Sequence, residues 1–297
     1  MKNPYPIICL FAVFFMFQSK SEAQKVILEK AVAKTSSWKA GLGYLSDNVY
    51  LGRKDSIALP YATASFGYYL KSGLFLSSTA SFAIGYSENR IDQVSLQGGY
   101  NYYSDKFNFE VSASKDFYSS QSFNVNSEIF GSLDAYFAYD LGFIEPTIQA
   151  GFNFASNPDY GIGLGLEHAF SVLDDKMEII PSFLANMATQ NFNASYYSKR
   201  RYSPNRRTKK QGTSTSDISA VLSDATKFQF MDYEFSLPIN YTFSKLTLNF
   251  TPTYAIPLNP SVVTLSQKQT NGNATSQTSP EVLSNVFYWS LGFTYKF

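Results

Sequence analysis

Hydrophobic and polar residues alternate along most of this chain, and the alternation is clearest in residues 286–297. The large apolar residues there occupy every second position, as Phe287, Trp289, Leu291, Phe293, Tyr295 and Phe297. The residues between them are mostly small or polar. A period of two places the two sets on opposite faces of a β-strand. An apolar strand at the edge of a soluble protein favours aggregation, whereas a closed membrane barrel pairs that edge with another strand.

The same alternation recurs in eleven earlier segments that are separated by turn residues. These segments are 37–46, 58–70, 74–86, 90–103, 106–118, 123–139, 143–155, 160–171, 176–192, 227–241 and 245–256. Each has the length of about ten residues that a tilted strand needs to cross a bilayer. The breaks after the even-numbered segments are short, and the two longest follow the ninth and eleventh segments. Short periplasmic turns and long extracellular loops give this order. With twelve strands, both chain termini lie on the periplasmic side.

The pattern predicts an all-β protein, a single antiparallel up-and-down transmembrane β-barrel over residues 36–297. We count twelve strands, with ten as the alternative. A secreted β-sandwich also has alternating strands, but it must pack its apolar faces on each other and usually has shorter strands. Aromatic residues on the outward face lie near both ends of the segments, as expected for two interfacial girdles.

The N-terminal residues 1–23 have the pattern of a secretory signal peptide. Lys2 precedes an apolar run over 7–17, and Ser21 and Ala23 place small residues at −3 and −1 of a cleavage site. The run is too short for a transmembrane helix. Residues 24–35 are then a short periplasmic lead. The single cysteine, Cys9, falls in the predicted signal, so no disulfide or cysteine metal site is expected in the mature chain.

The alternating aromatics that end in Phe297 resemble the C-terminal signal of Gram-negative outer-membrane β-barrel proteins, small porin-like barrels included. The resemblance implies a place in the outer membrane, contact with its lipid and lipopolysaccharide, and insertion by the barrel-assembly machinery. It implies no substrate, cofactor or functional residue, and it leaves the oligomeric state open.

Composition and charge fit this prediction and indicate where chemistry would lie. Aromatic residues make up 17% of the chain and charged residues 16%, and the formal net charge of +1 gives no electrostatic case for nucleic acid. The strand parity points ten acids into the lumen: Asp92, Glu110, Asp116, Glu128, Asp134, Glu145, Glu167, Glu178, Asp232 and Glu234. Basic residues that point inward from the strands are few, and Lys39, Arg90 and Lys296 are the clearest. An acidic lumen favours cations, but a closed barrel with internally neutralised charges is the alternative.

Two long loops, 193–226 and 257–284, are expected on the extracellular side. The first gathers seven basic residues: Lys199, Arg200, Arg201, Arg206, Arg207, Lys209 and Lys210. Lipopolysaccharide phosphates and the acidic lumen are candidate partners for them, and a mobile solvated loop is the simpler explanation. The second loop is rich in Ser, Thr, Asn and Gln, which predicts a flexible surface loop.

No catalytic or cofactor site is predicted. The only histidine, His168, falls on the lipid face near the periplasmic side, and the following Ala169 and Phe170 do not give the His-x-Ser pattern of outer-membrane lipases. The alternate glycines of 161–165 lie in a strand pattern that leads to no helix, so they are not a nucleotide loop. We therefore predict a non-enzymatic, porin-like passive channel for small polar or cationic solutes. A plugged structural or surface-interaction barrel that acts through its long loops is the alternative.

Overall fold

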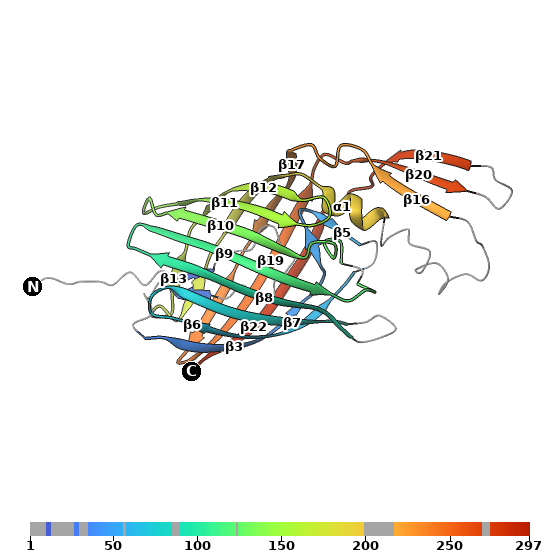
Figure 1. Ribbon diagram of the computed structural model, residues 1–297. Helices are drawn as coiled ribbons and strands as arrows, with labels where there is room; N and C mark the ends of the chain where they lie inside the picture. Colours follow the sequence, from blue (N-terminus) through green and yellow to red (C-terminus); the bar gives the residue numbers. More distant parts are fainter. Residues whose placement is uncertain are drawn as a thin grey trace, which may run out of the picture.

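The computed structural model describes residues 10–12, 27–29, 35–55, 58–84, 90–122, 124–198, 217–268 and 274–297. Its main body is a ring of twelve antiparallel strands, which closes because β22 pairs with β3 on one side and with β19 on the other (Figure 1). The predicted fold class and the count of twelve strands are confirmed.

The wall is made of long strands that neighbour one another in chain order. They are β3 (Ser37–Leu45), β6 (Tyr61–Tyr69), β7 (Leu74–Ala83), β8 (Arg90–Tyr103), β9 (Phe107–Tyr118), β10 (Gly131–Tyr139), β11 (Glu145–Phe154), β12 (Asp159–Glu167), β15 (Ser182–Ala188), β17 (Gln229–Ser236), β19 (Leu246–Pro257) and β22 (Val286–Lys296). Three short strands extend this wall: β13 (Phe170–Val172), β14 (Met177–Ile179) and β18 (Ile239–Phe243).

The remaining elements lie outside the wall sheet. They are the pair β1 (Leu10–Ala12) and β2 (Ile27–Glu29), the hairpin β4 (Val49–Tyr50) and β5 (Arg53–Lys54), the helix α1 (Asn191–Tyr196), and a separate sheet of β16 (Asp217–Leu222), β20 (Val262–Lys268) and β21 (Ala274–Pro280). Only β1 and β2 are described within residues 1–34, so the predicted signal peptide and lead stay predictions. Within the described residues, no helix is long and apolar enough to cross a membrane.

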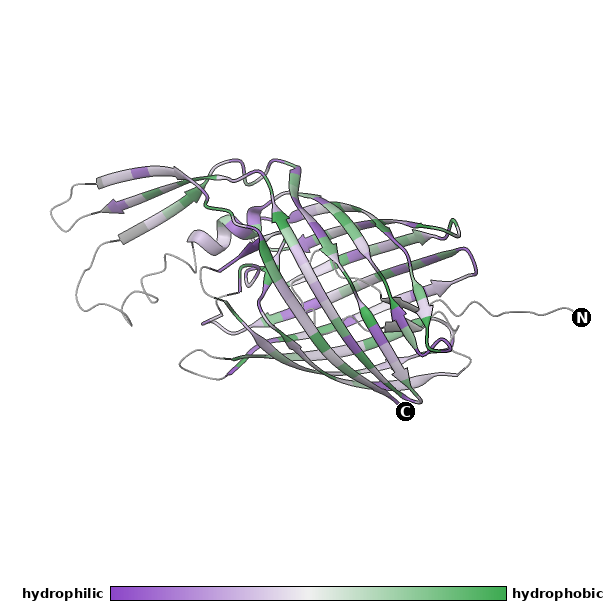
Figure 2. Cartoon of the chain, turned by 180° about the vertical axis from the view of Figure 1, so that it is seen from behind, coloured by the Kyte–Doolittle hydropathy of each residue, from purple (hydrophilic) through white to green (hydrophobic). Residues whose placement is uncertain are grey.

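The alternation in the sequence becomes an alternation in burial. Along β12, Ile162, Leu164 and Leu166 are exposed on the outer surface, while the glycines between them are buried on the inner face. Figure 2 shows hydrophobic bands alternating with polar ones along the strands of the wall. An apolar exterior around a polar interior is the inverse of a soluble domain and fits a barrel in hydrocarbon.

Outward aromatic rings contact one another from strand to strand near the predicted periplasmic ends. The Trp38 and Tyr68 ring centroids lie 4.5 Å apart, and those of Tyr102 and Phe107 lie 5.6 Å apart. Such rings favour the headgroup layer of a bilayer, so this row lies where an interfacial girdle is expected.

Two predicted strands are too long at their extracellular ends. The sixth, predicted over 123–139, begins at Gly131, and residues 124–130 form turns in which Val125 and Ile129 are buried. The ninth, predicted over 176–192, ends at Ala188 and is followed by α1. In both cases apolar residues that pack inside the barrel mouth continue the pattern of lipid-facing residues, and hydropathy alone does not separate the two environments.

The loop 257–284 also differs from the expected flexible surface loop. Its strands β20 and β21 form a hairpin, and β16 from the loop 193–226 pairs with β20. Threonine and serine side chains pair across this hairpin, with the Thr264 and Thr278 hydroxyl oxygens 3.1 Å apart. Thr is a favourable strand residue, so a polar composition does not exclude a strand.

The two faces of the wall should respond differently to the same charged side chain. We expect Leu164→Arg, on the lipid face of β12, to lower the free energy of unfolding by about 2–4 kcal/mol, because the guanidinium enters hydrocarbon. Ser77→Arg, at a half-buried inward position of β7, is the control and should cost much less. Urea titrations of both variants in lipid vesicles, followed by tryptophan fluorescence, measure the difference. Equal costs on the two faces would contradict this orientation of the wall.

Candidate functional site

The structure places nine of the ten candidate acids on wall strands, with their side chains on the inner face. Seven of them are buried: Asp92, Glu110, Asp116, Glu145, Glu178, Asp232 and Glu234. Asp134 and Glu167 are half-buried on the same face. Glu128 is the exception, since it lies in the turns of residues 124–130 and not in a strand. The inward carboxyl groups therefore lie on the contiguous strands β8 to β12 and on β14 and β17.

Two β-bulges add inward positions that strict alternation does not predict. The register between β7 and β8 shifts at Ser81/Phe82, so Asp92 and Gln93 are both buried, while Ile91 is 51% exposed on the outside. The register between β15 and β17 shifts at Asn186/Met187. As a result, Met231 and Asp232 are both fully buried. A bulge re-aims a side chain in this way by inserting one extra residue.

Neutral donors orient several of these acids. The donors and acceptors are Tyr61 Oη to Asp92 (2.5 Å), Asn186 Nδ2 to Asp232 (2.7 Å), Tyr136 Oη to Glu167 (3.1 Å), Asn108 Nδ2 to Glu145 (3.2 Å) and Tyr288 Oη to Glu234 (3.2 Å). Hydrogen bonds from neutral groups fix a carboxylate without adding positive charge. Asp92 differs from the others because Arg90 Nε also lies 3.2 Å from its Oδ1. Glu145 and Glu167 also face each other directly across β11 and β12, a like-charge arrangement that attracts cations.

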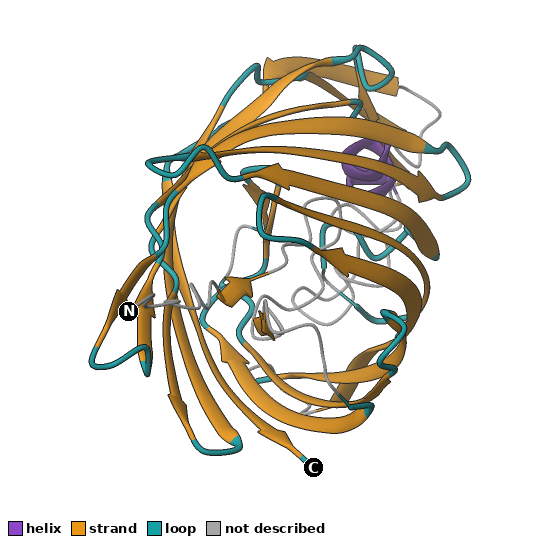
Figure 3. Cartoon of the chain, turned by 90° about the vertical axis from the view of Figure 1, so that its left-hand side faces the viewer, coloured by secondary structure: helices purple, strands orange, loops and turns teal. Residues whose placement is uncertain are grey.

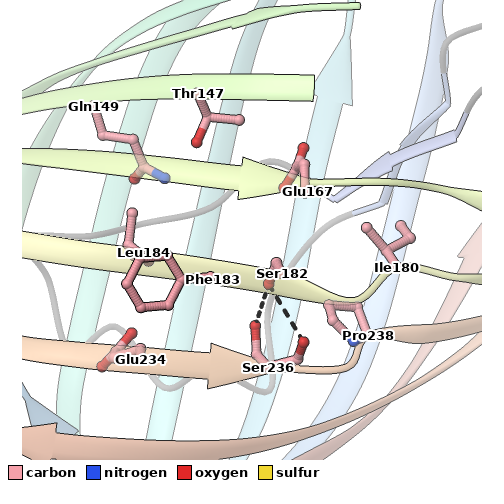
Figure 4. A pocket seen from close by; sticks show the side chains of 10 residues that line it. All are labelled: Thr147, Gln149, Glu167, Ile180, Ser182, Phe183, Leu184, Glu234, Ser236 and Pro238. Carbon is pink, nitrogen blue, oxygen red and sulfur yellow. Dashed lines mark hydrogen bonds between the residues drawn. The ribbon is translucent and has the colours of Figure 1, made fainter. Parts of the chain in front are cut away.

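A small polar cavity lies among β11, β12, β15 and β17 (Figure 4). Its volume is about 30 Å³, and Gln149, Glu167, Ser182, Glu234 and Ser236 are among its lining residues. The Ser182 and Ser236 hydroxyl oxygens are 2.6 Å apart. This space suits one or two water molecules. The described residues contain no group of three His, Cys, Asp or Glu side chains that could hold a metal ion.

The extracellular mouth is crossed by residues 47–55, which we call the mouth hairpin and which contain β4 and β5. Apart from the half-buried Lys54, all of its residues are buried. The hairpin starts at β3, yet the Tyr50 phenol oxygen accepts a hydrogen bond of 2.8 Å from Asn153 Nδ2 on β11. Since β3 and β11 lie on opposite sides of the ring, the hairpin spans the mouth. Burial raises the pKa of the Tyr50 phenol, so this contact is made by the neutral form.

Arg53 holds the tip of the mouth hairpin against the extracellular ends of β17 and β19. Its guanidinium donates to the carbonyl oxygens of Met231 at 2.6 Å, Leu258 at 2.8 Å and Asn259 at 3.1 Å. Its Nε lies 3.8 Å from Glu281 Oε2. Burial lowers the pKa of Arg53, but an arginine stays charged at any physiological pH. A buried charge with these acceptors is a strong and specific contact.

The residue before Arg53 allows the hairpin to approach the wall this closely. Gly52 has a φ of +70°, and a Cβ atom there would lie 2.8 Å from Pro257 Cβ and 3.0 Å from Asp232 Cβ. Only glycine combines this backbone conformation with such an approach.

Helix α1 fills another part of the mouth, inside the ring of strands (Figure 3). Asp159, the first residue of β12, accepts hydrogen bonds of 2.7 Å from the backbone N–H groups of both Asn191 and Phe192. The side chain of Asn193 donates to Glu281 at 2.9 Å. The helix is thus fixed both to the wall and to the segment that follows β21.

The mouth hairpin, the turns 124–130 and α1 meet in one apolar cluster. The cluster consists of Tyr50, Leu51, Val125, Ile129, Leu184, Ala188, Phe192, Tyr196, Tyr197, Ala220, Leu222, Met231 and Val263. The rings of Tyr50 and Phe192 meet edge to face, with centroids 4.6 Å apart. Close packing of this kind excludes water, so the cluster obstructs the extracellular end of the lumen.

The sequence reasoning did not find the mouth hairpin. The sequence does carry a signal for it, because Val49, Tyr50 and Leu51 form an apolar run between Asp47 and Arg53. An apolar run in a loop of a membrane barrel indicates burial in the lumen or against another loop, since an exposed loop has no reason to carry it.

The other candidates lie outside this constellation. The seven basic residues of 199–210 fall outside the described residues. His168 is half-buried, with its ring 4.6 Å from that of Phe170, which is exposed on the outer surface. His168 therefore lies beside the lipid face, as strand parity predicts, and away from the inward acids.

No protein-family model and no curated protein matches this chain. Solved structures that are similar to it include a KdgM porin, with a TM-score of 0.45 and 9% identity over 87% of this chain and 99% of that one. The COG4313 outer membrane channel from Pseudomonas putida F1 has a TM-score of 0.44 and 12% identity over 89% and 96%. LpxR from Salmonella typhimurium has a TM-score of 0.43 and 9% identity over 87% and 100%. Likenesses at this level carry no argument about activity or substrate.

The architecture itself identifies the kind of protein. A ring without free edges, apolar outside and polar inside, satisfies every backbone hydrogen bond in hydrocarbon, and such strands cross outer membranes. The chain is a twelve-stranded transmembrane β-barrel of the outer-membrane type.

Proposed function

We propose that this barrel is a passive channel for small polar or cationic solutes whose extracellular mouth is closed by the mouth hairpin in the described state and opens when the hairpin withdraws. The observation that carries the proposal is the contrast between the lumen and its closure. The lumen is lined by carboxyl groups on the wall itself, whereas the obstruction comes from a connection between two strands.

The closure is suited to release because it is made by the connection between β3 and β6 and not by the wall itself. Arg53 donates hydrogen bonds to β17 and to the residues after β19, and Tyr50 accepts one from β11. The backbone hydrogen bonds of the wall do not depend on these side chains. Below the mouth, small inward residues such as Gly41, Ser65 and Ser77 are half-buried. Small polar side chains at these positions leave room that a permanently filled core would occupy.

The alternative is a plugged barrel that works through its extracellular surface. Its support is the apolar cluster in the mouth and the sheet β16–β20–β21, which projects beyond the barrel (Figure 1). The two functions predict different ionic currents when the mouth hairpin is removed.

The test is to replace residues 48–54 with Gly-Ser-Gly and to measure single-channel currents in planar bilayers. We expect rare or no openings of the unmodified protein and steady, cation-selective openings of the variant, because the hairpin no longer crosses the mouth. A variant that lacks residues 265–277, at the outer part of the β20–β21 hairpin, is the control and should behave like the unmodified protein. A folded hairpin variant that carries no current would favour the plugged barrel.

A further inference from the structure

The periplasmic end of the lumen carries a pocket whose charge is opposite to that of the acidic wall. Its volume is about 380 Å³, and its lining residues are Thr35, Lys39, Ser244, Lys245, Thr247, Thr294, Lys296 and Phe297. The charged side chains among these residues are all lysines, and four of the others carry hydroxyl groups. The volume is in the range of pockets that bind small molecules.

The closing seam of the barrel brings the three lysines together. Lys39 on β3 and Lys296 on β22 face each other directly in the register. The Lys296 backbone N–H donates to the Lys245 carbonyl oxygen at 2.9 Å, so Lys245 stands next to Lys296 on the other side. The three lysines are thus backbone neighbours across the seam, on β3, on β22 and just before β19, and all three line the pocket. Three positive side chains around one pocket give it a potential that attracts anions.

The surroundings favour a donor-rich site for an anion. Lys39 Nζ lies 4.7 Å from the centre of the Tyr69 ring, which restrains its side chain. Thr247 and Thr294 face each other across β19 and β22, so both hydroxyls lie on the same face as the lysines. The Thr247 hydroxyl oxygen also lies 3.2 Å from that of Thr242. Ammonium and hydroxyl donors match the several acceptor oxygens of a phosphate or carboxylate group.

We infer that this pocket binds the phosphate or carboxylate group of a small solute at the periplasmic mouth. Lys39, Thr247, Thr294 and Lys296 alternate with lipid-facing residues and stand on the inner face of the wall. The ligand therefore comes from the aqueous lumen, and the wall separates it from the phospholipid headgroups around the barrel. The site adds an anion-binding step to a lumen that otherwise attracts cations, and it does not depend on whether the mouth hairpin moves.

The experiment is a titration of the folded protein in detergent micelles with inorganic phosphate, followed by calorimetry and by ³¹P line broadening. We expect saturable binding that Lys296→Gln weakens by roughly tenfold, the loss of one charge-assisted hydrogen bond. The double variant Lys39→Gln/Lys296→Gln should lose saturable binding. Lys106→Gln removes the same charge from an exposed residue just before β9 and should bind like the unmodified protein.

Several outcomes would overturn the inference. They are the absence of saturable phosphate binding to the unmodified protein, full binding by the double variant, or an equal loss in Lys106→Gln. Circular dichroism checks that each variant folds, and Lys245→Gln, in a turn, replaces the strand variants if they do not. Affinity should be the same in phosphatidylcholine and phosphatidylglycerol vesicles, and a loss in the second would assign the site to a lipid headgroup and reject a soluble ligand. The channel proposal is tested separately by the currents of the hairpin variant.

Discussion

Arg53→Met is expected to release the mouth hairpin while the barrel wall stays folded. Methionine fills a similar volume but donates no hydrogen bond, so the carbonyl groups of Met231, Leu258 and Asn259 lose their donor. Removing one partner of a buried charged contact costs about 3–5 kcal/mol. If the substitution destabilises the docked hairpin relative to the released one by about 3 kcal/mol, hydrogen exchange of the hairpin's backbone amides should become more than about a hundredfold faster. Exchange of amides in β9 and β10 should not change.

Lys54→Met is the matched control, since it removes the same charge from the next residue. Lys54 Nζ lies 2.7 Å from Asp47 Oδ2 within the same connection, and its side chain is 32% exposed. A partly exposed pair of this kind contributes about 0–1 kcal/mol. Arg53→Lys keeps the charge but not the planar set of donors and should fall between the two. If Arg53→Met and Lys54→Met exchange alike, Arg53 does not hold the mouth closed.

The wall of this barrel is predictable from the sequence because the two faces of each strand lie in different environments. Lipid on one side and the lumen on the other impose a period of two on long segments such as 90–103 and 286–297, and the structure has strands there. Turn residues between the segments fix the order of neighbours, since sequential strands of an up-and-down barrel pair with each other. The fold class therefore follows from local pattern alone.

The mouth is not predictable in the same way. Its apolar residues are buried among protein side chains, and hydropathy does not distinguish this environment from lipid. Val125 and Ile129 are as apolar as the lipid-facing residues of the strand that follows, yet they pack against Phe192 and Leu184 inside the barrel. Their position depends on contacts with segments that are distant in the sequence. The bulges at Asp92 and Met231 are equally invisible, since a one-residue shift in register is set by the neighbouring strand.

This difference separates the two kinds of residues that would carry function here. Most acids of the lumen sit on the regular wall, so their inward direction can be derived from parity, whereas Asp92 lies at a bulge. The residues that close the lumen sit on connections, where binding and regulatory residues of barrels commonly lie. In the proposed channel, selectivity would lie in the regular wall, and opening would lie in a connection that can move without breaking the wall.

Neutralising the facing acids of the wall should therefore change selectivity without closing the channel. In the variant that lacks residues 48–54, we expect Glu145→Gln/Glu167→Gln to lower the ratio of potassium to chloride permeability severalfold. The two carboxyl groups face each other across β11 and β12, and two unit charges within a lumen of intermediate dielectric each contribute on the order of 0.5–1 kcal/mol at salt near 0.1 M. Reversal potentials under a salt gradient measure the ratio. The effect should shrink as the salt concentration rises.

Asp105→Asn/Asp175→Asn in the same background is the control, because it removes two negative charges from exposed positions outside the lumen. Its permeability ratio should stay within about twofold of the parent, since solvent and salt screen charges at the surface. Glutamine and asparagine keep the shape and hydrogen-bonding capacity of the acids they replace, so conductance at high salt should be similar in both variants. If the two double variants shift the reversal potential equally, net charge and not the lumen lining sets the selectivity. The acidic wall would then have no role in choosing solutes.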